Sequence, residues 1–190
     1  MHILRMSSVL LLSLLAVGCT HTVVGNLNSN NGAAADAHTM YLESPAFKNN
    51  ESIPPKYTCD GESINPPLVL SGIPERTKSL VLLVHDPDVP KDLKPDGMFD
   101  HWVLYNIPPQ ALTIPENDPS IGITGKNGSG KTGYTGPCPP DKEHRYFFKA
   151  YALDAELAFP TPPTRAEVEE AIKSHILAEA ELIGKYNKQK

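Results

Sequence analysis

Residues 79–85, "SLVLLVH", set the architecture of this 190-residue chain. They form a short and nearly continuous apolar run, bounded by Lys78 on one side and by Asp86-Pro87 on the other. A run of this length without polar alternation predicts a central β-strand that is covered on both faces. We therefore expect a domain built around one buried strand.

Further strands are expected on both sides of this run in the sequence. Residues 101–107 and 145–153 are rich in aromatic and β-branched side chains, which favour strands. Residues 67–70 predict a fourth strand and residues 39–42 a weaker fifth. The 19 prolines lie mostly between these runs, so long irregular connections should join the strands.

One helix is expected late in the chain. Thr164 and Glu167 form a capping box directly after two prolines, which predicts a helix start. Apolar and polar residues then continue at helical spacing as far as 182–184, through Val168, Ala171, Ile172, His175, Ile176 and Glu179. His175 is expected on the surface of this helix. Because no helical patterns alternate with the strands, a doubly wound nucleotide-binding fold is disfavoured, and a mostly β domain with one late helix is predicted.

The first 38 residues are not expected to belong to the folded domain. Residues 1–18 combine Arg5 with an apolar run too short to span a bilayer, which needs about 20 residues, and predict a signal peptide. Small residues before Cys19 resemble the bacterial lipobox, in which the cysteine is acylated; an ordinary secretory signal is the alternative. Residues 19–38 should form a flexible tether, which leaves 39–190 as the domain.

Charge and cysteine content exclude several classes of function. The net charge of −5 and the lack of a basic stripe argue against nucleic-acid binding. Cys59 and Cys138 could form a disulfide in an exported protein or could be two small buried apolar residues. Their spacing fits no zinc site, and neither a metal nor a cofactor is expected.

Residues 125–132, "GKNGSGKT", match the phosphate-binding P-loop pattern at every position. A P-loop needs a buried strand before it and a helix that begins at its lysine. Residues 133–140 contain two glycines and three prolines, which cannot form the first turns of a helix. We therefore expect a glycine-rich surface loop with solvated Lys126 and Lys131 rather than a nucleotide site.

Candidate binding residues gather at the ends of the predicted strands. Asp86 follows the central strand, where a buried carboxylate is costly unless it meets hydrogen-bond donors. The nearest donors are His101, His144 and the hydroxyl of Tyr146. The alternative to such a binding site is an Asp-capped turn with two half-exposed histidines. Two imidazoles and a phenol could donate to a small anion while Asp86 fixes one tautomer, and such binding would strengthen below about pH 6.5.

Several separated motifs resemble the phosphatidylethanolamine-binding protein family, in its bacterial branch of Raf-kinase-inhibitor-like proteins. They are "DPDVP" (86–90), "DHWVLYNIP" (100–108), "GYTGPCPP" (133–140), "HRYFFKAYALD" (144–154) and "AEAEL" (178–182). Their order is that of the family, and the resemblance covers residues 41–186.

This resemblance implies a β-sandwich with a small anion-binding pocket at one end. Its walls, carried over by motif, would be Asp86, Asp88, Pro90, His101, Trp102, Pro139, Pro140, His144 and Tyr146. Members of the family accept phosphate-bearing head groups, acetate or similar anions, and some inhibit kinases or proteases. A His-His pair of the eukaryotic members is Asp100-His101 here, and their long C-terminal helix is absent.

The expected function is therefore that of an exported lipoprotein, anchored to a membrane through Cys19, that binds small anionic or phospholipid head-group ligands. Inhibition of a protease or kinase through the same region is an alternative. A hydrolase with His101 or His144 as general base is less favoured, because no nucleophile elbow or metal triad is visible. The sequence decides neither whether the protein has a protein partner nor whether it forms a homodimer.

A single substitution tests the predicted lipid anchor at Cys19. Thr20 follows the cysteine, which by the usual sorting pattern favours the periplasmic side of the outer membrane. Cys19→Ser should release the protein into the soluble fraction, because the acylated thiol is lost. Fractionation of cells that express both forms measures this. A variant that stays membrane-bound without acylation would show that the anchor lies elsewhere.

Overall fold

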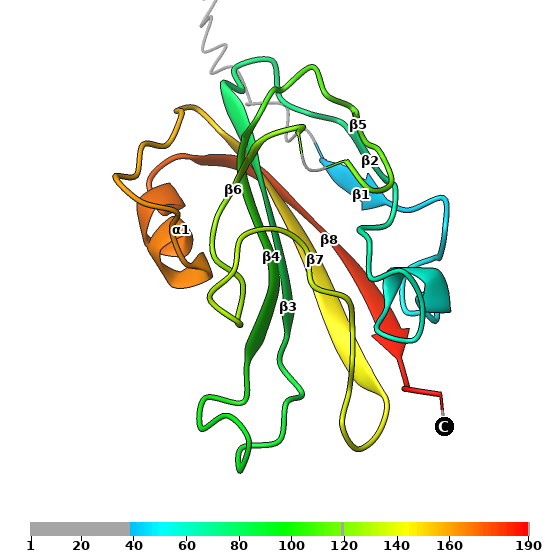
Figure 1. Cartoon of the computed structure of the whole chain (residues 1–190). Coiled ribbons are helices and arrows are strands. Elements are labelled where there is room, and N and C mark those ends of the chain that lie inside the picture. Colours follow the sequence, from blue (N-terminus) through cyan, green and yellow to red (C-terminus); the bar gives the residue numbers. More distant parts are fainter. Residues whose placement is uncertain (1–38, 119, 190) are drawn as a thin grey trace, which may run out of the picture. The chain divides into compact units, whose positions relative to one another are not determined.

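Two antiparallel β-sheets lie face to face in the computed structural model, which describes residues 39–118 and 120–189 (Figure 1). The smaller sheet has the order β1-β2-β5, with β1 Tyr41–Glu43, β2 Leu68–Ser71 and β5 Thr113–Ile114. The larger has the order β6-β4-β3-β7-β8, with β6 Ile123–Thr124, β4 Phe99–Ile107, β3 Ser79–Asp86, β7 His144–Leu153 and β8 Ile176–Tyr186. The predicted mostly β, sandwich-like fold is confirmed. The predicted signal peptide, Cys19 and tether lie outside the described residues.

The apolar run at 79–85 forms the centre of the larger sheet, as predicted. All residues of β3 are buried, and β3 pairs with β4 on one side and β7 on the other. Leu80, Leu82 and Val84 point into the core between the two sheets. Val81 and Leu83 belong to a second cluster on the opposite face of the sheet. A strand covered on both faces needs apolar residues at every position, which explains the missing alternation.

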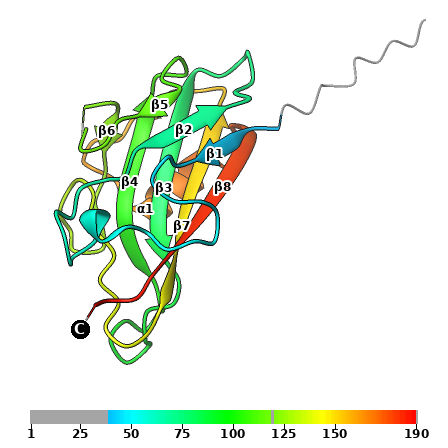
Figure 2. The same ribbon diagram turned by 90° about the vertical axis from the view of Figure 1, so that its right-hand side faces the viewer.

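Helix α1, Arg165–Ile172, covers that opposite face (Figure 2). The predicted capping box is present: the Thr164 side chain accepts from the backbone N–H of Glu167, and the Glu167 side chain accepts from the N–H of Thr164. Val168 and Ile172 are buried against the sheet. No helix among residues 39–118 and 120–189 has the length and apolar character needed to cross a bilayer.

The prediction that the helix continues to residues 182–184 is wrong. The helix ends at Ile172, and residues 176–186 form β8, which pairs with the whole length of β7. Ala178, Ala180 and Leu182 pack against the core between the sheets. The alternation of alanine with glutamate therefore follows the two-residue period of a strand. His175 lies in the turn before β8 rather than on a helix surface, with its Nδ1 2.8 Å from Asp154 Oδ1.

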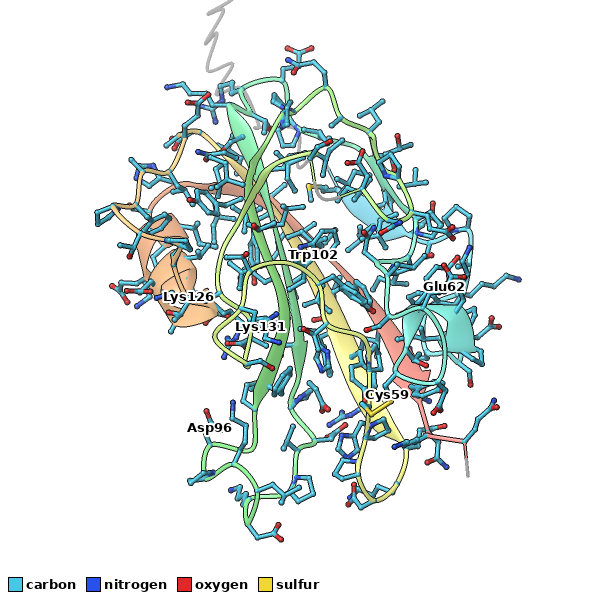
Figure 3. The ribbon with its side chains drawn as sticks, viewed as in Figure 1. Cys59, Glu62, Asp96, Trp102, Lys126 and Lys131 are labelled. Carbon is cyan, nitrogen blue, oxygen red and sulfur yellow. A yellow bond between two sulfur atoms is a disulfide. The ribbon has the colours of Figure 1, made fainter. Side chains whose placement is uncertain are left out.

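A disulfide joins Cys59 to Cys138, with a distance of 5.4 Å between the Cα atoms (Figure 3). Cys59 follows the short 3₁₀ helix η1, Pro55–Tyr57, and Cys138 precedes β7. The backbone N–H of Cys59 also donates to the carbonyl of Pro137 at 3.0 Å. The bridge thus fixes the irregular segment before β7 to the segment after η1.

Removing this bridge should destabilise the domain. The two cysteines are 79 residues apart, and a loop of that length constrains the unfolded chain by about 4 kcal/mol in the chain-entropy account. Urea unfolding of a Cys59→Ala, Cys138→Ala double variant should show a free energy of unfolding lower by about this amount. Labelling of both thiols in unfolded, unreduced wild-type protein would contradict the bridge.

Candidate functional site

A β-bulge in β4 turns two neighbouring side chains toward the interior. Val84 is paired with Trp102 and His85 with Asp100, so that His101 has no partner residue on β3. Strict alternation would place His101 and Trp102 on opposite faces of the sheet. Instead, the His101 ring lies 5.1 Å from the ring of core residue Tyr146, and Trp102 is also part of the core between the sheets. The bulge re-aims His101, as bulges beside binding sites commonly do.

His101 lines a cavity of about 470 Å³, which we call the main cavity. Its floor carries Asp86 and His101, both buried. Val89, Leu93 and Phe99 supply apolar wall, and Leu93 is 60% exposed. The remaining lining residues are Lys94, Thr135, Gly136, Cys138 and Pro140. The Nζ of Lys94 lies 5.1 Å from the centre of the Phe99 ring, so that one cation stands at an otherwise apolar wall.

The backbone of Thr135 fixes the tautomer of His101. His101 Nδ1 lies 2.6 Å from the carbonyl oxygen of Thr135. Because a carbonyl oxygen only accepts, Nδ1 carries the proton and Nε2 holds the lone pair when the ring is neutral. Burial lowers the pKa of His101, outweighing the raising effect of the Thr135 carbonyl and of Asp86. At neutral pH the cavity floor therefore presents an imidazole acceptor.

His144 lies behind the cavity floor, held between two carboxylates. Its Nδ1 is 2.8 Å from Asp86 Oδ2 and its Nε2 is 2.8 Å from Asp141 Oδ1, while the ring is fully buried. Both carboxylates accept, so both bonds form fully when both ring nitrogens carry protons. Burial lowers the pKa of His144, but the bonds and charges of Asp86 and Asp141 raise it overall. The expected donation from His144 to a ligand is therefore not available; His144 instead positions Asp86.

The other predicted site residues do not line the main cavity, although Tyr146 packs against His101. Asp88 forms an ion pair with Arg145, 2.7 Å from its guanidinium, and this hydrogen bond lowers the pKa of Asp88. Tyr146 is fully buried, and its hydroxyl has no hydrogen-bond partner among the described residues. Of the nine residues expected by motif, Asp86, His101 and Pro140 line the main cavity; those that do not are Asp88, Pro90, Trp102, Pro139, His144 and Tyr146.

Sequence reasoning missed the apolar wall and the role of Thr135. Leu93 lies between charged residues in the β3–β4 connection. An apolar side chain in such a loop was the one feature of the sequence that could have indicated this wall. Phe99 lies outside the predicted strand 101–107 but begins β4 in the structure, and only the bulge explains why it faces the cavity. Thr135 acts through its backbone carbonyl, which no side-chain pattern can reveal.

The P-loop-like string forms a surface loop that supports the wall of the cavity. Its lysines are exposed, and no helix follows it (Figure 3). The buried Asn127 side chain donates to the carbonyl of Gly133 and to the Thr135 hydroxyl. Its Oδ1 accepts from the backbone N–H groups of Ser129 and Lys131. Through Asn127, the string thus holds residues 133–135 in position.

Within residues 39–118 and 120–189, no group of three or more histidine, cysteine, aspartate or glutamate side chains is placed to hold a metal ion. Three of the side chains that line the main cavity are charged or titratable. These are the Asp86 carboxylate, the His101 imidazole and the Lys94 ammonium group.

Comparisons with known proteins agree with this architecture. The family model for phosphatidylethanolamine-binding protein matches residues 43–187. A UPF0098 protein of Chlamydia pneumoniae is 46% identical over 149 residues, which cover 78% of this chain and 99% of that protein. A UPF0098 protein of the archaeon Methanothermobacter thermautotrophicus is 44% identical over 155 residues, with coverage of 78% and 99%.

Two solved structures share the fold. The phosphatidylethanolamine-binding protein homologue CT736 of Chlamydia trachomatis superimposes with a TM-score of 0.78 at 45% identity, over 80% of this chain and 99% of that chain. Escherichia coli YbcL, described as a new member of the mammalian PEBP family, gives a TM-score of 0.71 at 29% identity, over 79% and 99%. The chain therefore belongs to the phosphatidylethanolamine-binding protein family.

Proposed function

We propose that this protein binds small phosphate- or carboxylate-bearing ligands that also carry a short apolar group, and that the main cavity is the binding site. The observation that carries the proposal is the composition of that cavity. Its floor offers the free Nε2 of His101, and its wall offers the apolar side chains of Val89, Leu93 and Phe99. A ligand that fits both has a polar head and an apolar body.

The head of such a ligand would meet His101 through one shared proton. The neutral ring accepts a proton from the O–H of a protonated phosphate or carboxylic acid, and the charged ring donates to the corresponding anion. In both cases the complex holds one proton more than the separated anion and neutral ring. Binding should therefore strengthen as pH falls toward the lowered pKa of His101. The nearby Asp86 carboxylate also favours stronger binding at lower pH, because it repels a fully ionised ligand head.

The apolar body would extend along the wall formed by Val89, Leu93 and Phe99. Each buried methylene contributes about 0.8 kcal/mol. Leu93 has the most apolar surface to bury against a ligand, since this residue is 60% exposed. Lys94, beside Phe99, would offset part of the charge of the head.

Several features favour binding over hydrolysis. The one cysteine in the lining, Cys138, is held in the disulfide and cannot act as a nucleophile. His101 Nδ1 is bonded to a backbone carbonyl rather than to the carboxylate that orients the histidine of a Ser-His-Asp triad. The predicted lipid anchor at Cys19 would also suit a binding protein, because a tethered domain can capture ligands close to a membrane surface.

Ethyl phosphate and butyl phosphate test both halves of this proposal. Butyl phosphate should bind about tenfold more tightly than ethyl phosphate, because it places two further methylenes against the wall. His101→Ala should weaken both ligands by about tenfold through the lost charge-assisted bond, and Leu93→Ser should mainly reduce the advantage of butyl phosphate. Wild-type affinity for both should fall between pH 5 and pH 8. Titration by NMR or calorimetry measures each constant.

His175→Ala is the matched control, since His175 lies in the turn before β8 and contacts Asp154. It should bind both ligands as the wild type does. Circular dichroism confirms that each variant folds. Equal affinities for the two ligands in every protein, or chemical shifts that cluster away from Asp86 and His101, would refute the assignment.

A further inference from the structure

The Cys59–Cys138 disulfide forms part of the wall of the main cavity. Cys138 is one of the residues that line the cavity, whereas Cys59 is not. Both residues are exposed, so the bridge lies at the molecular surface rather than in the buried core. Exposed disulfides are the ones that exchange with thiols, because the attacking sulfur needs access to them. A thiol that enters the main cavity is therefore placed beside one end of this bridge.

The attacking group in such an exchange is a thiolate, so the charges near each sulfur influence the reaction. On the cavity side, Lys94 and Asp86 line the space together with Cys138. The Asp86 carboxylate accepts a hydrogen bond from buried His144, which draws part of its charge away from the cavity. The Lys94 ammonium group lies over the Phe99 ring rather than against a carboxylate. A thiolate in the main cavity therefore has a cation that can attract it.

The other end of the bridge is less favourable for a thiolate. Cys59 lies in the turn after η1 and is followed directly by Asp60, whose charge repels an anion. Lys56, the basic residue of η1, is paired with Glu116. Because Cys59 does not line the main cavity, a thiol that attacks there makes no contact with the apolar wall. Attack at Cys138 should therefore be the faster of the two reactions.

The apolar wall selects the kind of thiol that reaches Cys138 from the cavity. Val89, Leu93 and Phe99 line the same space of about 470 Å³ as this cysteine. An aliphatic chain bound against them is held beside the bridge, and holding two reactants together raises the rate of their reaction. Each methylene that the wall buries adds about 0.8 kcal/mol to this binding. The favoured reactant is therefore a small aliphatic thiol.

The cavity wall keeps other attachments when the bridge opens. The backbone N–H of Thr135 donates to the carbonyl of His101, and the N–H of Cys59 donates to that of Pro137. Neither hydrogen bond involves a sulfur atom. The bond between Cys59 and Pro137 also keeps the freed thiol of Cys59 close to Cys138, the residue after Pro137. The bridge can therefore open and close again while the segment stays in position.

We propose that Cys138 is a site of reversible covalent attachment for small aliphatic thiols that enter the main cavity. The thiolate attacks the Sγ atom of Cys138; a new S–S bond forms between the two, and the bond between Cys138 and Cys59 breaks. Cys59 leaves as a thiolate and takes up one proton, so that no oxidant or reductant is consumed. Attack of the Cys59 thiolate on Cys138 reverses the step and releases the thiol. This chemistry does not depend on the binding of a phosphate or carboxylate head.

The position of the adduct tests this proposal. Folded wild-type protein is mixed briefly with 3-mercaptopropionate or with 6-mercaptohexanoate, and methyl methanethiosulfonate then stops the exchange. Mass spectrometry of an acidic digest gives the ratio of adducts on Cys138 to adducts on Cys59, which does not depend on the pKa of the thiol. This ratio should be about fivefold or more for 3-mercaptopropionate. It should be about tenfold higher again for 6-mercaptohexanoate, whose three further methylenes contact the wall.

Leu93→Ser should remove most of the advantage of the longer thiol. Leu112→Ser is its matched control, because Leu112 is 54% exposed and Leu93 60%, but Leu112 does not line the main cavity. Lys94→Met should lower the ratio about fivefold for both thiols, through the loss of one cation. Three outcomes would overturn the proposal: no adduct on either cysteine of the folded wild type, a wild-type ratio of one or less, or equal ratios for the two thiols.

Discussion

Residues 133–138 have no regular secondary structure, yet their position fixes one wall of the main cavity. Thr135 is bonded to the backbone and to the side chain of His101 on β4. On the other side, the N–H of Gly136 donates to Ser63, and Cys138 is joined to Cys59. An irregular segment must find partners for its backbone groups outside a ladder, and here β4 and the region after η1 supply them. The segment is thereby held in place as a wall of the main cavity.

The bulge in β4 determines which side chain of that strand faces this wall. By giving His101 no partner on β3, it allows His101 and Trp102 to face the interior together. His101 then lines the main cavity, and Trp102 packs in the core between the sheets. The Asp86–His144 pair lies beneath the main cavity and keeps a carboxylate beside His101. Binding chemistry in this fold thus comes from local departures from regular strand geometry.

The sequence predicts the regular parts of this molecule well, because burial on two faces leaves a clear apolar run in β3 and a capping box marks the start of α1. It fails at residues 176–186, where alternating alanine and glutamate satisfy helical and strand periods alike, and only pairing with β7 decides between them. The motifs identify Asp86 and His101 as site residues. They cannot reveal that Asp141 occupies the second nitrogen of His144, or that a bulge brings Phe99 beside His101.

The ¹⁵N chemical shifts of the His101 ring nitrogens test the central claim most directly, because that claim assigns one proton and one lone pair to known atoms. In the free protein at neutral pH, we predict a protonated Nδ1 and an unprotonated Nε2, as the bond to the Thr135 carbonyl requires. Saturation with butyl phosphate should move Nε2 toward the protonated shift and leave the nitrogens of His144 unchanged. A proton on Nε2 in the free protein, or a His101 ring that does not respond to the ligand, would contradict the proposed site.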